Sequence, residues 1–123
     1  MLGDYCSLSS GVKIWCASND FVNDVVTIIP PEAGSIKTNL ITGDVILENY
    51  TAVGANSVIM PDNHIPEGTV IGALSFVPTN FEFKSWAVYA GIPVRYMKPR
   101  NRENVLAQVK EIERRIRALT SNG

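Results

Sequence analysis

An aliphatic residue returns at every sixth position through the middle of the chain. The run has seven consecutive members, which are Ile41, Leu47, Val53, Ile59, Ile65, Ile71 and Val77. The position four residues after each of the first six holds a residue of small or modest size: Val45, Thr51, Ser57, Asn63, Thr69 and Ser75. An amphipathic helix would repeat near 3.6 residues, and a single strand would alternate only over a short run. The pattern therefore predicts two inward-facing positions in every hexapeptide.

Short strands that repeat every six residues are typical of a parallel β-helix, in which three strands make one triangular coil and the coils stack. The expected corners hold residues that tolerate turn backbones, namely Gly43, Gly54, Gly68 and Gly72 and the pairs 48–49, 62–63 and 67–68. The predicted fold class is all-β, with coils about 4.8 Å apart, the ordinary spacing of paired strands.

The repeat is interrupted once near its beginning. Leu2, Leu8 and Ile14 are also six residues apart, but Ile14 and Ile41 are separated by 27 residues (41 − 14), which is not a multiple of six. A loop insertion at about 15–40 must therefore protrude from the coils. Its Pro30-Pro31 pair fits this prediction. Long loops on rigid scaffolds often carry function, and a decorative surface loop is the alternative.

The repeat ends after Val77, and residues 78–100 are predicted to form a closing segment of the β-helix domain, which spans 1–100. Residues 101–123 are predicted to form a helix, with Asn101 as its N-cap. Apolar residues fall on one stripe of that helix, at Val105, Val109, Ile112, Ile116 and Leu119. The stripe is expected to pack on the chain's own β-helix or on a neighbouring subunit.

The overall composition excludes several classes of protein. The 123 residues carry 11 basic and 12 acidic side chains, so no global field favours nucleic acid or an anionic membrane. No apolar run reaches the length of a membrane span, and the first residues lack the features of a signal peptide, which predicts a cytoplasmic protein. Cys6 and Cys16 form neither a metal-type pair nor a disulfide framework, and both are expected to be reduced.

Several segments resemble the hexapeptide-repeat sugar acyltransferases. Residues 53–61 (VGANSVIMP) and 71–77 (IGALSFV) are similar to two late coils of that family, and residues 86–100 (WAVYAGIPVRYMKPR) are similar to its closing segment. Residues 5–14 (YCSLSSGVKI), followed by 17–21 (ASNDF), resemble the subgroup that acetylates amino-dideoxy sugars on nucleotide carriers, or related sugars, for bacterial surface polysaccharides.

This resemblance implies a left-handed β-helix, a homotrimer and an acetyl-coenzyme A co-substrate bound in a groove between adjacent subunits. The implied acceptor is a sugar or nucleotide sugar that is acetylated on an amine or a hydroxyl. Relatives usually have several coils before the segment that begins at Gly3, so N-terminal coils are expected to be missing here. The alternative is a non-catalytic hexapeptide protein that serves as a structural or sugar-binding module, and this short length favours it.

Candidate coenzyme-binding residues lie in the last coils and the closing segment. The small residues Ala55, Ser57, Ala73 and Ser75 would let a pantetheine arm approach the coil backbone, although they also fit the corners and the interior of a narrow coil. By resemblance, Arg95 and Lys98 are the candidates to pair with the phosphates of the coenzyme. A solvated surface role is the alternative for each cation.

Candidate catalytic residues lie in the inserted loop. Many relatives have a histidine there, but this chain has Asn19 and Asp20. Asp20 is a candidate to accept a proton or orient the acceptor, and Asn19 to bond the acceptor or the oxyanion; stabilisation of a turn is the alternative for both. His64, the single histidine, is expected at an outward corner and is a further candidate to shuttle a proton. One histidine per chain cannot supply the three ligands that a shared zinc needs, so no metal is predicted.

Overall fold

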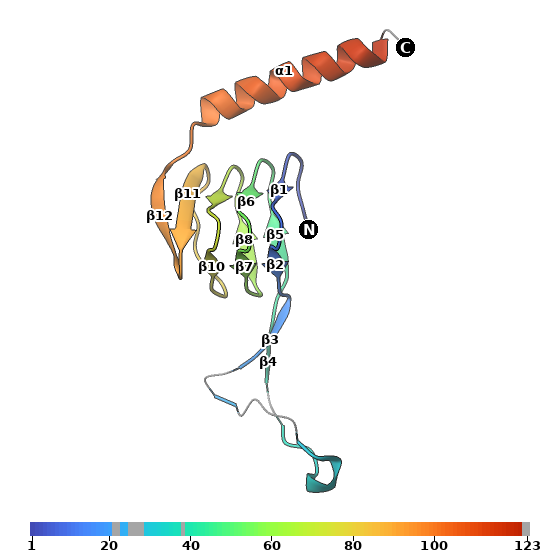
Figure 1. The fold of residues 1–123 in the computed structure, drawn as a ribbon, viewed down its shortest axis with the longest axis vertical. Coiled ribbons are helices and arrows are strands. Elements are labelled where there is room, and N and C mark those ends of the chain that lie inside the picture. The colour runs from blue at the N-terminus through green and yellow to red at the C-terminus, as the bar shows by residue number, and fades with distance from the viewer. Residues whose placement is uncertain (21–22, 25–28, 38, 122–123) are drawn as a thin grey trace.

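The computed structural model describes residues 1–20, 23–24, 29–37 and 39–121. Within these residues the chain is mostly β, with one C-terminal helix (Figure 1). In chain order the elements are β1 (Ser7–Leu8), β2 (Lys13–Ile14), β3 (Ala17–Asn19), the 3-10 turn η1 (Pro31–Ala33), β4 (Leu40–Thr42), β5 (Val45–Leu47), β6 (Ala52–Val53), β7 (Val58–Ile59), β8 (Asn63–Ile65), β9 (Val70–Ile71), β10 (Phe76–Val77), β11 (Ala87–Gly91), β12 (Val94–Pro99) and α1 (Arg102–Ser121).

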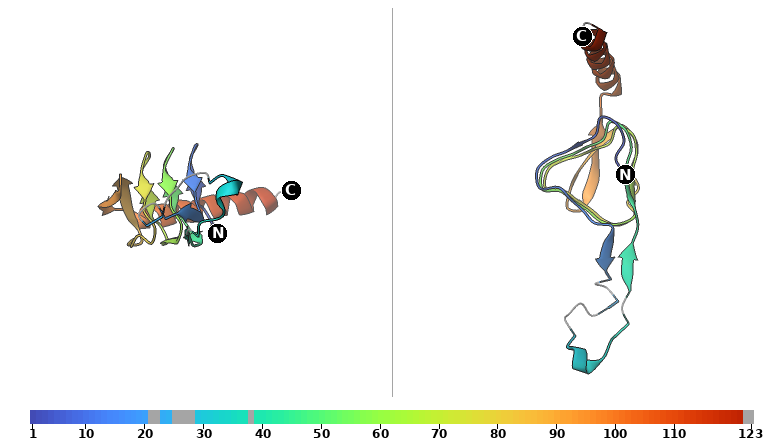
Figure 2. Two further views of the ribbon diagram at one scale, coloured as in Figure 1. Left: turned by 90° about the horizontal axis from the view of Figure 1, so that it is seen from below. Right: turned by 90° about the vertical axis from the view of Figure 1, so that its right-hand side faces the viewer.

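The short strands stack in parallel to form three walls. One wall has the order β1-β6-β9-β11, the second has β2-β7-β10, and the third has β5-β8. Paired residues are 18 positions apart where no insertion intervenes, as for Ala52 with Val70 (70 − 52), so three hexapeptides complete one coil. Viewed along the stack, the coils superpose as a three-sided ring (Figure 2).

The six-residue pattern is explained by the interior of this ring. Both inward positions of each hexapeptide are buried from Val45 to Val77, and the aliphatic members are at most 2% exposed from Leu47 onward. The prediction of two inward positions is therefore confirmed for these coils. Ile41 is an exception, because it lies in β4, outside the ring, and is 37% exposed. Its assignment as the first member of the run is wrong, since its six-residue spacing from Leu47 is not accompanied by a place in a coil.

The inserted segment projects from the ring as a two-stranded ribbon. Strands β3 and β4 pair antiparallel, with Ser18 opposite Ile41. The amide of Trp15 still bonds the carbonyl oxygen of Ile59 at 2.9 Å, so the first coil extends one residue beyond β2. The ribbon ends with Thr42, two residues later than the sequence predicts. Phe21, which closes the resembling motif at 17–21, lies outside the described residues.

The C-terminal end of the stack is closed by the hairpin of β11 and β12 and by a cluster of aromatic rings. Phe81 and Phe83 both contact the buried Tyr89, at ring-centroid distances of 5.8 and 4.9 Å. The hydroxyl of Tyr89 accepts a hydrogen bond from the amide of Lys84 at 2.7 Å. These contacts bury the last coil without continuing the six-residue repeat.

One corner of the ring carries a ladder of aromatic side chains. Tyr5 stacks on Tyr50 at 5.7 Å between ring centroids, and Tyr50 contacts Trp86 at 5.8 Å. Gly68 occupies the intervening coil with a φ of +74°, and a Cβ there would lie 2.2 Å from the Trp86 ring. The missing side chain of Gly68 therefore makes room for the indole.

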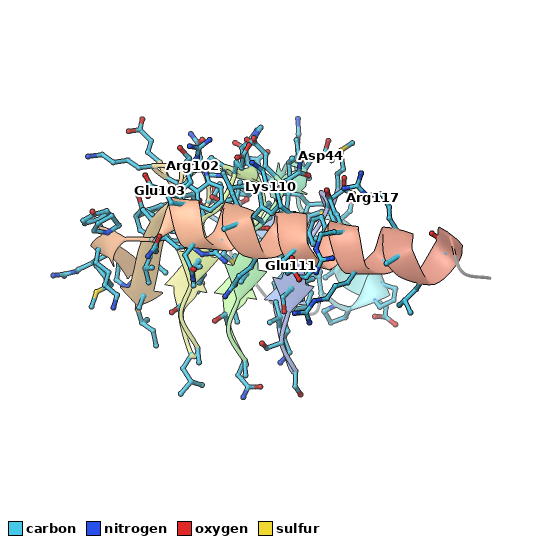
Figure 3. All side chains as sticks on the ribbon, turned by 90° about the horizontal axis from the view of Figure 1, so that it is seen from above. Asp44, Arg102, Glu103, Lys110, Glu111 and Arg117 are labelled. Carbon is cyan, nitrogen blue, oxygen red and sulfur yellow. The ribbon has the colours of Figure 1, made fainter. Side chains whose placement is uncertain are left out.

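Helix α1 passes over the coils from the closing hairpin toward the first coil (Figure 3). The side-chain oxygen of Asn101 accepts a hydrogen bond from the amide of Asn104 at 3.0 Å, which confirms the predicted N-cap. Val109 is buried, and Glu113 accepts a bond from the Tyr5 hydroxyl at 3.2 Å, whereas Leu119 is 77% exposed. The first half of the apolar stripe thus packs on the chain's own coils. Residues 122–123, at the end of the predicted helix segment, are not described.

Candidate functional site

A column of small residues follows the corner between the first and second walls. Ser10, Ala55 and Ala73 occupy equivalent positions in successive coils, because the amide of Asn56 bonds the oxygen of Ser10 at 3.0 Å and the amide of Leu74 bonds the oxygen of Ala55 at 2.9 Å. Ser10 and Ala73 are exposed and Ala55 is half-buried. The main chain along this column is therefore accessible from outside the ring.

Glycines beside this column let the coils approach closely. A Cβ on Gly54 would lie 2.4 Å from the amide nitrogen of Ala73, and one on Gly72 would lie 3.1 Å from the Cβ of Ala90. A larger side chain at Gly54 would therefore collide with the next coil. The result is a strip of small residues, Gly54, Ala55, Gly72 and Ala73, along which an extended ligand could lie.

The hydroxyls of Ser57 and Ser75 do not reach this surface. Both side chains are buried inside the ring, at 0% and 3% exposure. Ser57 Oγ donates to the oxygen of Gly72 at 2.9 Å and accepts from the amide of Ser75 at 3.2 Å, while Ser75 Oγ accepts from the amide of Gly91 at 3.2 Å. Their predicted contact with a coenzyme can hold only through the backbone, because the hydroxyls satisfy interior groups.

Three cations near the end of the closing segment have different surroundings. Arg95 and Lys98 are exposed on β12, where they pair with Ala90 and Val88. Arg100 instead folds back onto the aromatic corner. It donates to the carbonyl oxygens of Tyr50 and Gly68, and burial lowers the pKa of its guanidinium from the usual value. Arg95 and Lys98 are thus accessible to an anion, and Arg100 is engaged in the fold.

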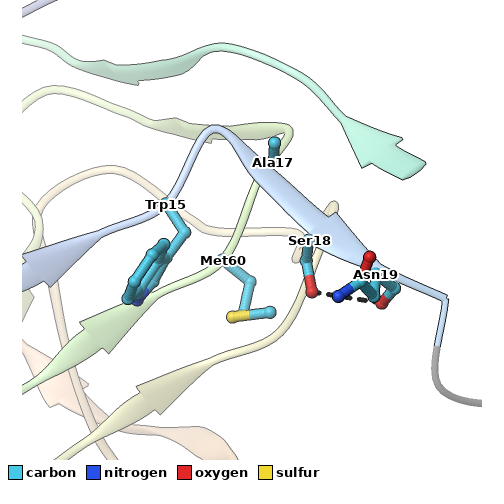
Figure 4. A pocket seen from close by; sticks show the side chains of 5 residues that line it. All are labelled: Trp15, Ala17, Ser18, Asn19 and Met60. Atoms are coloured by element: carbon cyan, nitrogen blue, oxygen red, sulfur yellow. Dashed lines mark hydrogen bonds between the residues drawn. The ribbon is translucent and has the colours of Figure 1, made fainter. Parts of the chain in front are cut away.

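A shallow pocket lies where the ribbon leaves the ring. It has a volume of about 330 Å³ and is lined by Trp15, Ala17, Ser18, Asn19 and Met60 (Figure 4). Apolar side chains from two coils form one side of the pocket, and Ser18 and Asn19 of β3 bring polar groups to the other. Such a mixture of apolar wall and convergent polar groups is typical of small-molecule sites.

Asn19 and Asp20, two of the predicted catalytic residues, lie together at this end of the ribbon. Asn19 lines the pocket. Asp20 follows it and accepts hydrogen bonds from the backbone and side-chain nitrogens of Asn23, at 3.2 and 2.7 Å. The carboxylate therefore stabilises a local turn, and the structure leaves its chemical role a prediction.

His64 lies apart from both features. The sequence predicts His64 at an outward corner, but the residue lies in the middle of β8. Its side chain points outward, as predicted. Its Nε2 contacts the carboxylate of Glu48 on the neighbouring coil. The third wall carries this pair, so a role for His64 in proton transfer also stays a prediction.

Sequence reasoning missed Ser10, Trp15, Ser18 and Met60. The six-residue register could have found Ser10, because it follows Leu8 by two residues, as Ala55 follows Val53. The pocket could not be found in this way, since it depends on where the ribbon leaves the ring.

Among the described residues, no group of three His, Cys, Asp or Glu side chains could hold a metal ion, and no helix is long and apolar enough to cross a bilayer.

Comparisons with known proteins give consistent matches. The chain is 29% identical over 104 residues to the dTDP-4-amino-4,6-dideoxy-D-glucose acyltransferase of Escherichia coli, covering 83% of this chain and 51% of that enzyme. It is 25% identical over 122 residues to a chloramphenicol acetyltransferase of Agrobacterium fabrum, covering 92% of this chain and 57% of that protein. No protein-family model matches the chain.

Solved structures of AntD, an N-acyltransferase from Bacillus cereus, match the fold. One, with dTDP-4-amino-4,6-dideoxyglucose and coenzyme A bound, has a TM-score of 0.76 and 31% identity, covering 91% of this chain and 58% of AntD. Another, with dTDP and coenzyme A, has a TM-score of 0.74 and 32% identity, covering 60% of AntD. The chain thus spans between half and three fifths of the length of these relatives. The matches confirm the resemblance of this chain to the hexapeptide-repeat sugar acyltransferases.

Proposed function

We propose that this protein transfers an acyl group, acetyl in the simplest case, from acyl-coenzyme A to the amine of a nucleotide-linked amino-dideoxy sugar. The observation that carries the proposal is the column of Ser10, Ala55 and Ala73, which has exposed Arg95 and Lys98 at its C-terminal end. A thioester carrier with a long neutral arm and charged phosphates needs this combination of open backbone and cations. The sequence-based prediction of a cytoplasmic protein is part of this proposal.

The donor would lie along the column. Neighbouring coils are about 4.8 Å apart, so the amides of the pantetheine arm would meet backbone groups of successive coils. The phosphates would lie near Arg95 and Lys98, where charge-assisted hydrogen bonds are strongest. The thioester would then lie near the first coil, at Ser10.

Two substituted positions of AntD have the same residue types and spacing as two residues of this chain. The solved structures include AntD variants at a serine and at an aspartate ten positions later in that chain. In this chain Ser10 and Asp20 are the same residue types at the same separation (20 − 10). From its place in the first coil of the column we assign Ser10 to the acyl end of the donor, and from the place of Asn19 in the pocket we assign Asn19 and Asp20 to the acceptor.

The two halves of the site require a second subunit. Ser10 lies in the turn that precedes β2, and Trp15 follows the other end of that strand, so the second wall separates the two residues. An acceptor in the pocket of one chain would therefore meet a donor held by the column of its neighbour. We infer a homotrimer of left-handed coils, which agrees with the six-residue repeat and with the half-buried apolar Val58 and Phe76 on the outer face of the second wall.

The reaction needs the protein to position the two substrates and to supply a group that accepts or orients a proton. The acceptor nitrogen attacks the thioester carbonyl, a C–N bond forms, and the C–S bond breaks to release the coenzyme thiol. The acceptor ammonium loses one proton before the amine attacks, and the nitrogen loses a second on the way to the amide. One proton ends on the leaving thiolate and the other passes to solvent. In this proposal Asp20 accepts or orients a proton, and holding the two substrates together supplies much of the rate.

The test is a transfer assay on the full chain. Acetyl-coenzyme A and dTDP-4-amino-4,6-dideoxyglucose should give release of the coenzyme thiol and a product heavier by one acetyl group. The matched control is the same nucleotide sugar with a hydroxyl in place of the amine. Binding of acetyl-coenzyme A, seen as a rise in melting temperature, without transfer to any amino sugar would favour the alternative of a non-catalytic, sugar-binding coil protein.

A further inference from the structure

The indole of Trp15 is a large apolar group that lies outside the packed core of the coils. Trp15 is 51% exposed and lines the pocket at the base of the ribbon. Its coil neighbour is Met60, because Ile14 pairs with Ile59 in the parallel strands β2 and β7. The two side chains therefore occupy the same outward position on successive coils (Figure 4). Together they form a continuous apolar wall, which we call the Trp15–Met60 wall.

Polar groups flank this wall. Ser18 and Asn19 line the other side of the same pocket, and Asp20 follows directly along the chain. An amide and a hydroxyl opposite an indole suit a ligand with one apolar face and a polar edge. A hexose ring has this character, because its axial C–H groups form an apolar face and its hydroxyls and ring substituents lie around the edge.

We propose that the Trp15–Met60 wall binds the hexose ring of the acceptor and selects sugars that are deoxygenated at C6. This inference rests on the proposed function. In a 4-amino-4,6-dideoxy sugar, C6 is a methyl group, which can pack on the Met60 thioether without leaving a buried hydroxyl unpaired. The ring stacks on the indole, and the amine at C4 then points toward Asn19 and Asp20.

Binding measurements on Trp15 variants test this assignment. In Trp15→Ala, the affinity for dTDP-4-amino-4,6-dideoxyglucose should fall about tenfold or more, as expected for the loss of an aromatic contact and its buried area. The affinity for dTDP alone should be unchanged, because the nucleotide does not use the wall. Trp15→Phe should retain most of the affinity for the sugar. Ile36→Ala is the matched control, since Ile36 is an exposed apolar residue of the same inserted segment outside the pocket.

Three outcomes would overturn the proposal. An equal loss of affinity for dTDP and for the nucleotide sugar would show that the wall binds the nucleotide. Dissociation of the oligomer in Trp15→Ala, measured by light scattering, would show that the indole is a subunit contact. Unchanged sugar affinity would remove Trp15 from the site.

Selectivity provides a second test, in which Met60 is varied. Wild-type protein should prefer the 6-deoxy amino sugar to its 6-hydroxy counterpart, and Met60→Gln should reduce that preference. Equal use of both sugars by the wild type would contradict the inference and leave the proposed acyl transfer intact. No transfer to either sugar, with acetyl-coenzyme A bound, would contradict the proposed function itself.

Discussion

Arg95 and Lys98 project from the same face of β12 although they are three residues apart. Arg95 pairs with Ala90 and Lys98 with Val88, and paired residues of an antiparallel ladder share a face. In a regular strand, residues three apart point to opposite faces. The register shifts by one residue between Val88 and Tyr89, which leaves Met97 as the extra residue of a β-bulge. The bulge thus brings both cations to one side of the closing hairpin.

Removal of either cation should weaken coenzyme binding. We expect Arg95→Ala and Lys98→Ala each to lower the affinity for acetyl-coenzyme A about tenfold, because each removes a charge-assisted hydrogen bond to phosphate. The melting temperature and the oligomeric state should be unchanged. Calorimetric titration at two salt concentrations measures the effect, since salt screens exposed charges. Lys110→Ala is the control on helix α1, and equal affinity in all four proteins would contradict the assignment.

The carboxylate of Asp20 can be separated from its local role by a conservative change. Asp20→Asn keeps an acceptor for the Asn23 amide but removes the negative charge. We expect a fall in the transfer rate of about a hundredfold, the usual size of a general-base contribution. Binding of acetyl-coenzyme A should not change. An unaltered rate across the pH range would show that Asp20 only stabilises the turn, and Asp44→Asn is the control for an exposed carboxylate.

Ser57 should matter for stability rather than for the coenzyme. Ser57→Ala removes the hydroxyl that bonds the oxygen of Gly72 and leaves the buried amide of Ser75 without that acceptor. The expected loss in the free energy of unfolding is about 2 kcal/mol. It can be measured by urea unfolding at fixed protein concentration. A lower affinity for acetyl-coenzyme A at unchanged stability would restore Ser57 as a direct ligand.

Arg100 should likewise act on the fold. Its guanidinium bonds the carbonyl oxygens of Tyr50 and Gly68 and lies 5.7 Å from the centre of the Trp86 ring. Arg100→Ala should lower the free energy of unfolding by about 2 kcal/mol, because two carbonyls lose a charged donor. Arg102→Ala is the matched control, because Arg102 also lies over the Trp86 ring. The hydrogen bonds to the two carbonyl oxygens come from Arg100. An equal effect of both substitutions would contradict the hydrogen-bonding explanation.

The role of His64 can be tested by the pH dependence of transfer. His64→Gln retains a polar side chain beside Glu48 but cannot gain or lose a proton at neutral pH. We expect the pH profile of the transfer rate to be the same in variant and wild type, because the pair lies on the third wall and not beside the pocket. A shift or loss of one limb of the profile would identify His64 as the proton carrier.

The repeating part of the fold could be read directly from the chain. Each coil repeats the same packing problem, so Leu47, Val53 and Ile59 recur with a period that no helix or flat sheet produces. The cap at Asn101 was equally local, because it depends on one side chain and a backbone amide three residues away. The same reasoning was wrong for Ile41, because a six-residue spacing alone does not distinguish an inward position of a coil from a position on the ribbon.

The candidate site depended on features that the sequence leaves open. The spacing of Arg95 and Lys98 predicts opposite faces, and only the bulge at Met97 brings them together. Likewise, Trp15 and Met60 are 45 positions apart (60 − 15), and they meet because the insertion leaves the ring and returns in register. The sequence by itself determined the coil, because the coil is a repeated local pattern. The tertiary structure decided the site, because the site is made where that pattern is broken.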